Sequence, residues 1–292
     1  ESVPTAFYFW NAQIMSKVAG IIGKDDDRKN YQALAKRIGE KYNRKYLDIS
    51  TGNYNDGSQM ANAFPLFLGL VPEGSAPKVL DNLVTDILDK NNAHLTTGVL
   101  GTKYMPEALA RMGRADVAWE IINQKTAPSW NDMMDKYTTV CEFWTLKQSK
   151  NHVMMGSIDA WFYKYIAGIQ LDESNPAFKT FTIRPDRFLL PVRSAKPVRS
   201  ARATLSTLRG KISSEWKSND GQFSLNVHVP FNTSATVYLP GDENDVLTES
   251  GIALKKDNGI EYLGFRNKCH QLKVCSGNYK FIVKRKGANV FY

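Results

Sequence analysis

The sequence predicts a multidomain protein of α and β elements, in which a partial (α/α)6 toroid precedes a small antiparallel β-sandwich. Up to residue 170, apolar residues recur at three- and four-residue steps, which is the period of amphipathic helices. Short turns alternate with longer polar loops there, as the helical hairpins of a toroid require. After Gly168 the period changes to two, which indicates strands. We therefore predict two domains, residues 1–170 and residues 171–292.

The first domain is predicted to consist of helical hairpins. Gly23 closes the first helix, and Asp25-Asp26-Asp27 places negative charge in the first turn of the second, where the helix dipole favours it. Only about seven helices fit before residue 170, so we expect this chain to carry the C-terminal portion of a toroid whose earlier helices precede it. The predicted helices span about residues 5–22, 25–42, 58–68, 76–90, 104–112, 115–124 and 149–169.

The second domain alternates apolar and polar residues in short runs. Residues 211–217 and 222–229 are joined through Asn219-Asp220-Gly221, and Asp-Gly is a strong signal for a hairpin turn. Short strands separated by Gly, Pro and Asn turns favour a sandwich. His228 is expected on the exposed face of its strand, with no role in chemistry. Further strands are predicted at 181–185, 236–239 and 279–283.

Composition and charge narrow the classes of function. The 292 residues are 42% hydrophobic and 23% charged, as in ordinary globular proteins, and no apolar run is long enough to insert into a membrane. Nearly all of the net charge of +9 lies after residue 170. No basic stripe interleaved with aromatic residues accompanies it, so we predict no nucleic-acid partner. The basic excess indicates a solvated face or, alternatively, attraction to an acidic polysaccharide.

No metal or cofactor is predicted. The three cysteines, Cys141, Cys269 and Cys275, lack metal-ligand spacing, and the four histidines are scattered. Cys269 and Cys275 could pair across neighbouring strands, although two buried thiols are the simpler expectation. Calcium held by backbone carbonyls would leave no such pattern in a sequence.

One carboxylate stands out. Glu142 follows the polar loop Tyr137–Cys141 and precedes Phe143 and Trp144, just before an apolar helix. Removing a carboxylate from water favours its neutral acid, which suits a group that transfers protons near neutral pH. The simpler alternative is that Glu142 caps the next helix or pairs with a lysine.

Four motifs add a family resemblance. They occur in the order and spacing of bacterial α-L-rhamnosidases, glycoside hydrolase family 78, and the resemblance extends from near Thr5 to about Leu239. The motifs are His94-Leu95-Thr96-Thr97-Gly98-Val99-Leu100-Gly101-Thr102, Pro128-Ser129-Trp130, Thr138-Thr139-Val140-Cys141-Glu142-Phe143-Trp144, and Asn151-His152 with Gly156-Ser157-Ile158, Trp161-Phe162-Tyr163 and Ala167-Gly168-Ile169.

The resemblance implies hydrolysis of terminal α-L-rhamnosyl linkages with inversion, acting on rhamnose-containing oligosaccharides or polysaccharides such as plant glycans. It implies that Glu142 is the general base and that the general acid lies in the missing N-terminal part of the polypeptide, so that this chain alone is inactive. A periplasmic or secreted location would fit such substrates. Two residues depart from the family pattern: Cys141 replaces a commonly aromatic residue and Phe143 a commonly basic one. These changes leave the carboxylate in place but alter its neighbours.

The resemblance also implies five substrate-binding residues. His152 would hydrogen-bond sugar hydroxyls, and Trp130 and Trp144 would face the apolar side of the deoxy-sugar, whose C6 is a methyl group. Thr96 and Thr97 would lie at the rim of the site. The structural alternative for His152 is a satisfied structural histidine, and for the two tryptophans it is core packing.

Two other classes of function stay open at this point. The chain could be a sugar-binding or structural fragment that cleaves nothing. It could also belong to another (α/α)6 carbohydrate enzyme, such as a phosphorylase. A phosphorylase would need basic residues beside the site, and none is adjacent to Glu142 in the sequence.

Overall fold

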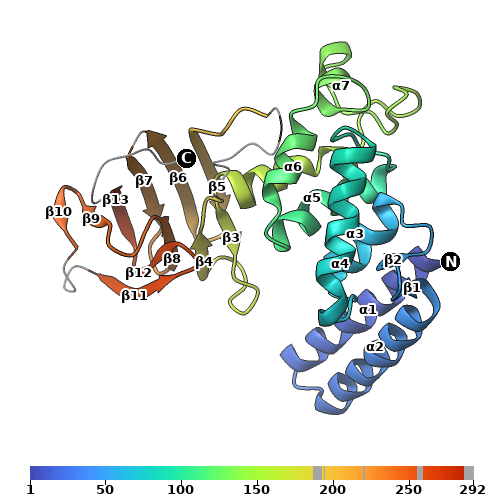
Figure 1. Ribbon diagram of the computed structural model, residues 1–292. Coiled ribbons are helices and arrows are strands. Elements are labelled where there is room, and N and C mark those ends of the chain that lie inside the picture. The colour runs from blue at the N-terminus through green and yellow to red at the C-terminus, as the bar shows by residue number, and fades with distance from the viewer. Residues whose placement is uncertain (187–192, 194, 220, 255–258, 286–292) are drawn as a thin grey trace. The chain divides into compact units, whose positions relative to one another are not determined.

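The computed structural model describes residues 1–186, 193, 195–219, 221–254 and 259–285, and the chain forms two compact units, Glu1–Ser157 and Ile158–Tyr292 (Figure 1). The first unit is helical and the second consists mainly of strands, as predicted. The segment that begins at Ile158 belongs to the second unit, so the structural division precedes the predicted boundary after residue 170.

The first unit contains helical hairpins and two short strands. Helices α1 and α2 form the first hairpin, which turns at Gly23 with φ of 72°. Asp25, Asp26 and Asp27 occupy the first turn of α2, as predicted. The elements are α1 (Ser2–Ile21), α2 (Asp25–Tyr46), β1 (Leu47–Asp48), β2 (Asn53–Tyr54), α3 (Gln59–Leu68), η1 (Glu73–Ser75), α4 (Ala76–Thr85), η2 (Asp86–Lys90), α5 (Val99–Arg111), α6 (Ala115–Ile122), α7 (Trp130–Lys136) and α8 (Val153–Gly156).

Aromatic side chains hold three of these helices together. The ring of Tyr104 on α5 lies 4.7 Å from that of Phe67 and 5.0 Å from that of Phe64, both on α3. Trp10 on α1 meets Tyr104 edge-on at 5.9 Å. These separations fall in the favourable range for aromatic pairs. The apolar period of the sequence therefore translates into a shared aromatic core.

The predicted helix over residues 149–169 is wrong as a continuous element. It consists of α8, then α9 (Ile158–Trp161) and the π-helical η3 (Phe162–Ile166), which lie in the second unit. The Ser157 hydroxyl donates to the Met154 carbonyl at 2.6 Å and so competes for a helical acceptor, which is a common way for serine to interrupt a helix. Helix α7 was not predicted.

The second unit is a two-sheet sandwich. One sheet has the order β10-β9-β13-β7-β6-β5 and the other β11-β12-β8-β4-β3, with all pairs antiparallel except β4 with β8. Asn219 pairs with Gln222, as the predicted hairpin requires, although Asp220 lies outside the described residues. The strands are β3 (Ile169–Leu171), β4 (Thr180–Ile183), β5 (Ser200–Thr207), β6 (Gly210–Asn219), β7 (Gln222–Val229), β8 (Ser234–Pro240), β9 (Val246–Glu249), β10 (Ile252–Ala253), β11 (Ile260–Arg266), β12 (Cys269–Val274) and β13 (Gly277–Lys284).

The core between the sheets explains where the units divide. Large buried side chains from both sheets, among them Phe181, Trp216 and Phe281, form one cluster. The Trp216 indole N–H donates to the Ile166 carbonyl at 2.7 Å, and the Ser214 hydroxyl donates to the Ala167 carbonyl at 2.7 Å. Both bonds are buried, so the end of η3 is bound to the inner face of β6.

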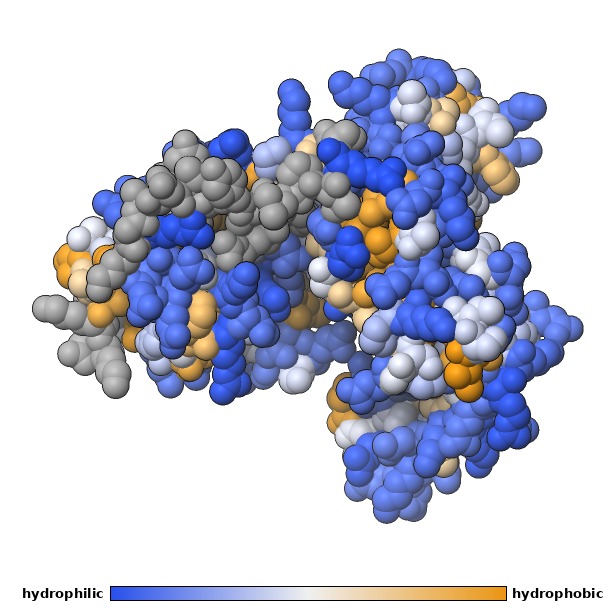
Figure 2. Space-filling model, viewed as in Figure 1, coloured by the Kyte–Doolittle hydropathy of each residue, from blue (hydrophilic) through white to orange (hydrophobic). Residues whose placement is uncertain are grey.

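The three cysteines differ in burial. Cys141 and Cys269 are buried and Cys275 is exposed, so the expectation of a buried thiol was wrong for Cys275; none of the three forms a disulfide within the described residues. Figure 2 shows mostly hydrophilic residues on the faces in view, with small separate hydrophobic patches. None of the described helices has the length and apolar character required to cross a bilayer.

We predict that Asp186 makes the stability of the chain fall as pH rises. Burial raises the pKa of this carboxyl to about 6, from 3.8, and Arg184 offsets the rise only in part. Between these values the folded chain binds more protons than the unfolded chain, so the free energy of unfolding decreases from about pH 4 to about pH 6. At roughly 1.4 kcal/mol per pKa unit, the loss amounts to about 3 kcal/mol.

Denaturant unfolding across this pH range measures the effect. Asp186→Asn is expected to be the more stable form above about pH 6 and to lose the decline. Asp159→Asn, which changes an exposed aspartate of the same unit, serves as the control. Equal pH dependence in the two variants would contradict the assignment.

Candidate active site

The loop that carries Glu142 doubles back on itself. The Glu142 backbone N–H donates to the Ser149 carbonyl at 2.8 Å, and the His152 N–H donates to the Val140 carbonyl at 2.9 Å. The Thr139 hydroxyl adds a bond to the Lys150 carbonyl. Glu142 and His152 therefore lie on facing arms of one loop, although they are ten positions apart in the sequence.

Cys141 anchors this loop. Its side chain is fully buried with Met133 and Met155, and its backbone N–H donates to the Met133 sulfur at 2.9 Å. The residue before Glu142 is therefore held in the core, while Glu142 itself is half-buried and Phe143 is 47% exposed. A small thiol fits this buried position.

Glu142 is less enclosed than we expected, and its carboxylate is unpaired. It forms no ion pair or side-chain hydrogen bond with any described residue. The residue that caps α8 is His152, whose Nδ1 accepts from the Met154 N–H at 3.3 Å. Helix capping and lysine pairing, the structural alternatives for Glu142, are therefore not observed. An unpaired carboxylate is free to accept a proton from a bound water.

Two indoles join the loop to the helices around it. The rings of Trp130 and Trp144 lie 5.5 Å apart and nearly perpendicular, at 88°. The Trp130 N–H donates to the Met155 carbonyl at 3.0 Å, and the Trp144 N–H donates to the Thr97 carbonyl at 2.8 Å. Trp130 is only 7% exposed, whereas Trp144 is half-buried. Of the two rings, Trp144 therefore offers more surface to a ligand.

The two threonines differ in accessibility. Thr97 is buried, and its hydroxyl lies 3.1 Å from that of Thr102. A Cβ at Gly101 would come within 2.5 Å of the Thr97 Cβ, so only glycine permits this close packing. Thr96 is exposed, and its backbone N–H donates to Gln59 Oε1 at 2.9 Å.

Two buried amides on α3, Gln59 and Asn62, position these loops. Gln59 is fully buried, and its side chain donates to the His94 carbonyl at 3.0 Å in addition to accepting from the Thr96 N–H. It therefore holds the backbone on both sides of Leu95. Asn62, one turn later on α3, accepts from the Tyr54 N–H at 2.9 Å and donates to Asn53 Oδ1 at 2.9 Å. In the sequence, the signal that could have identified them was two amides spaced three residues apart in an otherwise apolar helix.

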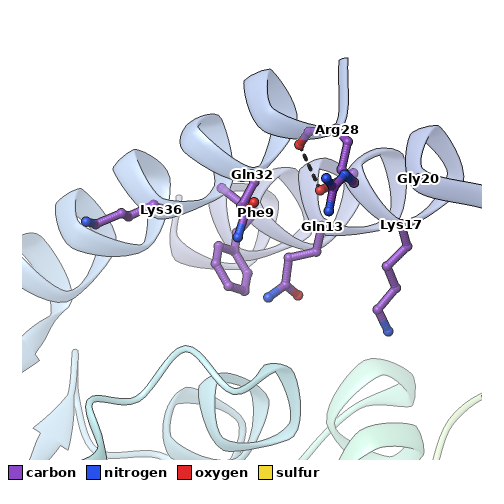
Figure 3. A pocket seen from close by; sticks show the side chains of 9 residues that line it. Phe9, Gln13, Lys17, Gly20, Arg28, Gln32 and Lys36 are labelled. Carbon is purple, nitrogen blue, oxygen red and sulfur yellow. Dashed lines mark hydrogen bonds between the residues drawn. The ribbon is translucent and has the colours of Figure 1, made fainter. Parts of the chain in front are cut away.

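A groove elsewhere in this unit contains none of these residues. It lies between α1 and α2, has a volume of about 540 Å³, and is crossed by a hydrogen bond from the Ser16 hydroxyl to the Arg28 carbonyl (Figure 3). Within the described part of the chain, no three His, Cys, Asp or Glu side chains are grouped so that they could hold a metal ion.

Comparison with known families agrees with this architecture. The model of the bacterial alpha-L-rhamnosidase 6 hairpin glycosidase domain matches residues 1–166. The chain belongs to this bacterial α-L-rhamnosidase family. The model of the bacterial alpha-L-rhamnosidase C-terminal domain matches residues 168–253. The helical unit is thus part of a six-hairpin domain, and antiparallel sheets follow it, as in rhamnosidase structures.

Similar proteins include several α-L-rhamnosidases. That of Streptomyces avermitilis is 31% identical over 296 residues, which is 97% of this chain and 27% of the relative, and one from Formosa agariphila is 27% identical over 97% of this chain and 31% of its own length. The structure of the Dictyoglumus thermophilum α-L-rhamnosidase matches with a TM-score of 0.84 and 32% identity, over 96% of this chain and 31% of that one. The S. avermitilis enzyme complexed with L-rhamnose matches with a TM-score of 0.85 and 31% identity, over 97% and 27%. The chain therefore spans less than a third of the length of these family members.

We predict that Gln59 is required for the stability of the helical unit. In Gln59→Leu the His94 carbonyl and the Thr96 N–H lose their buried partner, which should lower the free energy of unfolding by about 2–4 kcal/mol. Gln32→Leu, on the exposed side of α2, is the matched control and should stay within about 0.5 kcal/mol of the wild type. Chemical denaturation measures both, and equal effects would exclude a positioning role for Gln59.

Proposed function

We propose that the protein to which this chain belongs hydrolyses terminal α-L-rhamnosyl linkages with inversion of configuration, and that Glu142 is its general base. The proposal rests on the unpaired Glu142 carboxylate within a chain of the α-L-rhamnosidase family. Family relatives bear the name α-L-rhamnosidase, and one was crystallised with L-rhamnose. Rhamnose-containing oligosaccharides and polysaccharides are the proposed substrates.

Inversion requires two carboxyl groups and one water. The base removes a proton from the water as its oxygen attacks the anomeric carbon, and a general acid protonates the leaving glycosidic oxygen. The two carboxyl groups lie roughly 6.5–9.5 Å apart in inverting enzymes, to leave room for the water. Glu142 is the proposed base, and the proposed acid lies in a segment of the six-hairpin domain that precedes this chain.

The surroundings of Glu142 suit a deoxy-sugar. The half-buried Trp144 ring is proposed to contact the apolar side of rhamnose, with Trp130 packed edge-to-face against it. The exposed Thr96 hydroxyl is proposed to contact the ligand directly. Buried Thr97 contributes indirectly, because its carbonyl holds the Trp144 indole.

His152 is proposed to donate a hydrogen bond to a sugar hydroxyl. Because its Nδ1 accepts from the Met154 N–H, the neutral ring carries its proton on Nε2, which is then a donor. The histidine would therefore combine a structural bond on one nitrogen with a ligand contact on the other.

We predict that Glu142→Gln in the full-length polypeptide lowers kcat/KM for a chromogenic α-L-rhamnoside by about 10²–10⁴-fold, because the amide cannot accept the proton of the water. Binding of L-rhamnose, measured by calorimetry, should persist. Glu73→Gln changes an exposed glutamate of η1 and should leave the rate unchanged.

Three results would contradict parts of this proposal. Full activity of Glu142→Gln would exclude the base assignment. Hydrolysis by the 292-residue chain alone at the full-length rate would place the acid within these residues. A full-length protein that binds rhamnose but cleaves no rhamnoside would be a sugar-binding protein instead.

The two roles of His152 can be separated by two substitutions. Asparagine can accept the Met154 N–H as an N-cap but cannot replace the imidazole donor, whereas alanine can do neither. We expect His152→Ala to lower the free energy of unfolding by about 0.5–2 kcal/mol and His152→Asn to preserve it. Both should raise KM about 10-fold, the equivalent of one lost hydrogen bond. An unchanged KM in His152→Asn would leave the histidine with a structural role only.

A further inference from the structure

The outer face of the six-stranded sheet in the second unit carries an ordered set of polar side chains. On β6 and β7 the residues alternate strictly, with Trp216 and Leu225 in the core and Glu215 and Asn226 facing away from it. The pairing of four neighbouring strands then aligns the outward residues in rows. One row consists of Arg202, Glu215, Asn226 and Lys280, and the next of Thr204, Ser213, His228 and Asn278.

The rows line a shallow hollow. Its volume is about 340 Å³, and residues of both rows line it together with Tyr279. This is at the lower end of the roughly 300–1,000 Å³ typical of small-ligand sites. Adjacent strands lie about 4.8 Å apart, so a row across four strands extends about 14 Å, which is longer than a single sugar ring.

The charged side chains of the hollow form no ion pairs with described residues. Arg202 and Glu215 are neighbours across β5 and β6 but form no ion pair, and Lys280 forms none with any described residue. His228 is oriented by a 2.8 Å bond from its Nδ1 to Asn278 Oδ1. The sequence analysis expected this histidine to be exposed and without a function, whereas it is half-buried in the hollow.

Cations predominate over the whole outer face of these strands. Lys211, Lys217 and Lys284 also point outward from them, and Glu215 is the single carboxylate of the rows and these flanking positions within the described residues. A second carboxylate, Glu249 on β9, borders the hollow, where it accepts from the Ser250 hydroxyl at 2.6 Å and from the Lys280 N–H at 3.4 Å. The face is therefore positively charged around a hollow that also contains acceptors, namely Glu215 and the amide oxygens of Asn226 and Asn278.

We propose that this hollow is a second saccharide-binding site and that it takes an oligosaccharide bearing uronate carboxylates. Sugar hydroxyls both donate and accept, so they match a row that alternates Arg, Glu, Asn and Lys. The uronate carboxylate matches the unpaired Arg202 and Lys280. Phosphate and the DNA backbone offer only acceptors in such a contact, and Glu215 would repel them. The site is independent of Glu142 and does not require the proposed hydrolysis.

Calorimetric titration of the 292-residue chain with trigalacturonate, and with its fully methyl-esterified form, tests the proposal. Trigalacturonate should bind, and esterification, which removes the charge but keeps the hydroxyls, should weaken binding at least about 10-fold, the equivalent of one charge-assisted hydrogen bond. The double variant Arg202→Gln, Lys280→Gln should show the same loss. The control Lys268→Gln, Lys273→Gln removes two charges from the other sheet and its turn and should bind as the wild type does.

Glu215→Gln distinguishes a saccharide from another polyanion. It should weaken trigalacturonate binding, because the neutral amide oxygen is a weaker acceptor for a sugar hydroxyl than the carboxylate and its NH₂ group opposes a second one, and this result would support the site. Tighter binding of trigalacturonate, or of a single-stranded oligonucleotide, would show a general polyanion surface and overturn it. Equal binding by the two double variants would likewise exclude the hollow. Thermal unfolding of each variant establishes that it is folded, and hydrolysis of rhamnosides does not enter the measurement.

Discussion

Two indole-to-carbonyl hydrogen bonds determine where the candidate catalytic loop lies. Trp144 belongs to the loop and is bound to the carbonyl of Thr97 before α5, while Trp130 begins α7 and is bound to the carbonyl of Met155 in α8. The two rings then pack against each other. Segments far apart in the sequence are thereby tied at one point, and a buried indole N–H left without its acceptor would be costly. The position of Glu142 depends on this arrangement and on the buried Cys141 beside it.

In the second unit, too, an indole N–H donates to a backbone carbonyl of a distant segment. Trp216 binds the carbonyl of Ile166, so the short helical segment after Ser157 is held by the sheet. A consequence is that the inner face of β6 serves packing and the outer face is left for polar side chains. The alternation that stabilises the sandwich also produces the cross-strand rows of Arg202, Glu215, Asn226 and Lys280.

The candidate site shows why motif residues do not all have the same kind of role. Thr97, Trp130 and Cys141 are buried and support the loop, whereas Thr96, Glu142 and Trp144 reach the surface. A sequence motif contains buried supporting residues and surface residues alike, and does not distinguish them. Gln59 and Asn62 lie outside the motifs, yet they hold the backbone that carries Thr96 and the loop around Asn53.

The family motif in the sequence selected Glu142 as the candidate base. Periodicity and turn chemistry by themselves determined the order of helices then strands, the hairpin at Gly23, and the pairing of the strands on either side of Gly221. These depend on neighbouring residues, so local patterns suffice. The structure alone decided the interruption of the helix at Ser157, the strand Ser200–Thr207, and the lack of a partner for Glu142 among the described residues. Ser157 interrupts through a side-chain bond that competes with the helix, and Ser200–Thr207 buries only small residues and Leu205 against its sheet. Whether a carboxylate is paired depends on side chains brought near it by tertiary packing, which no local pattern contains.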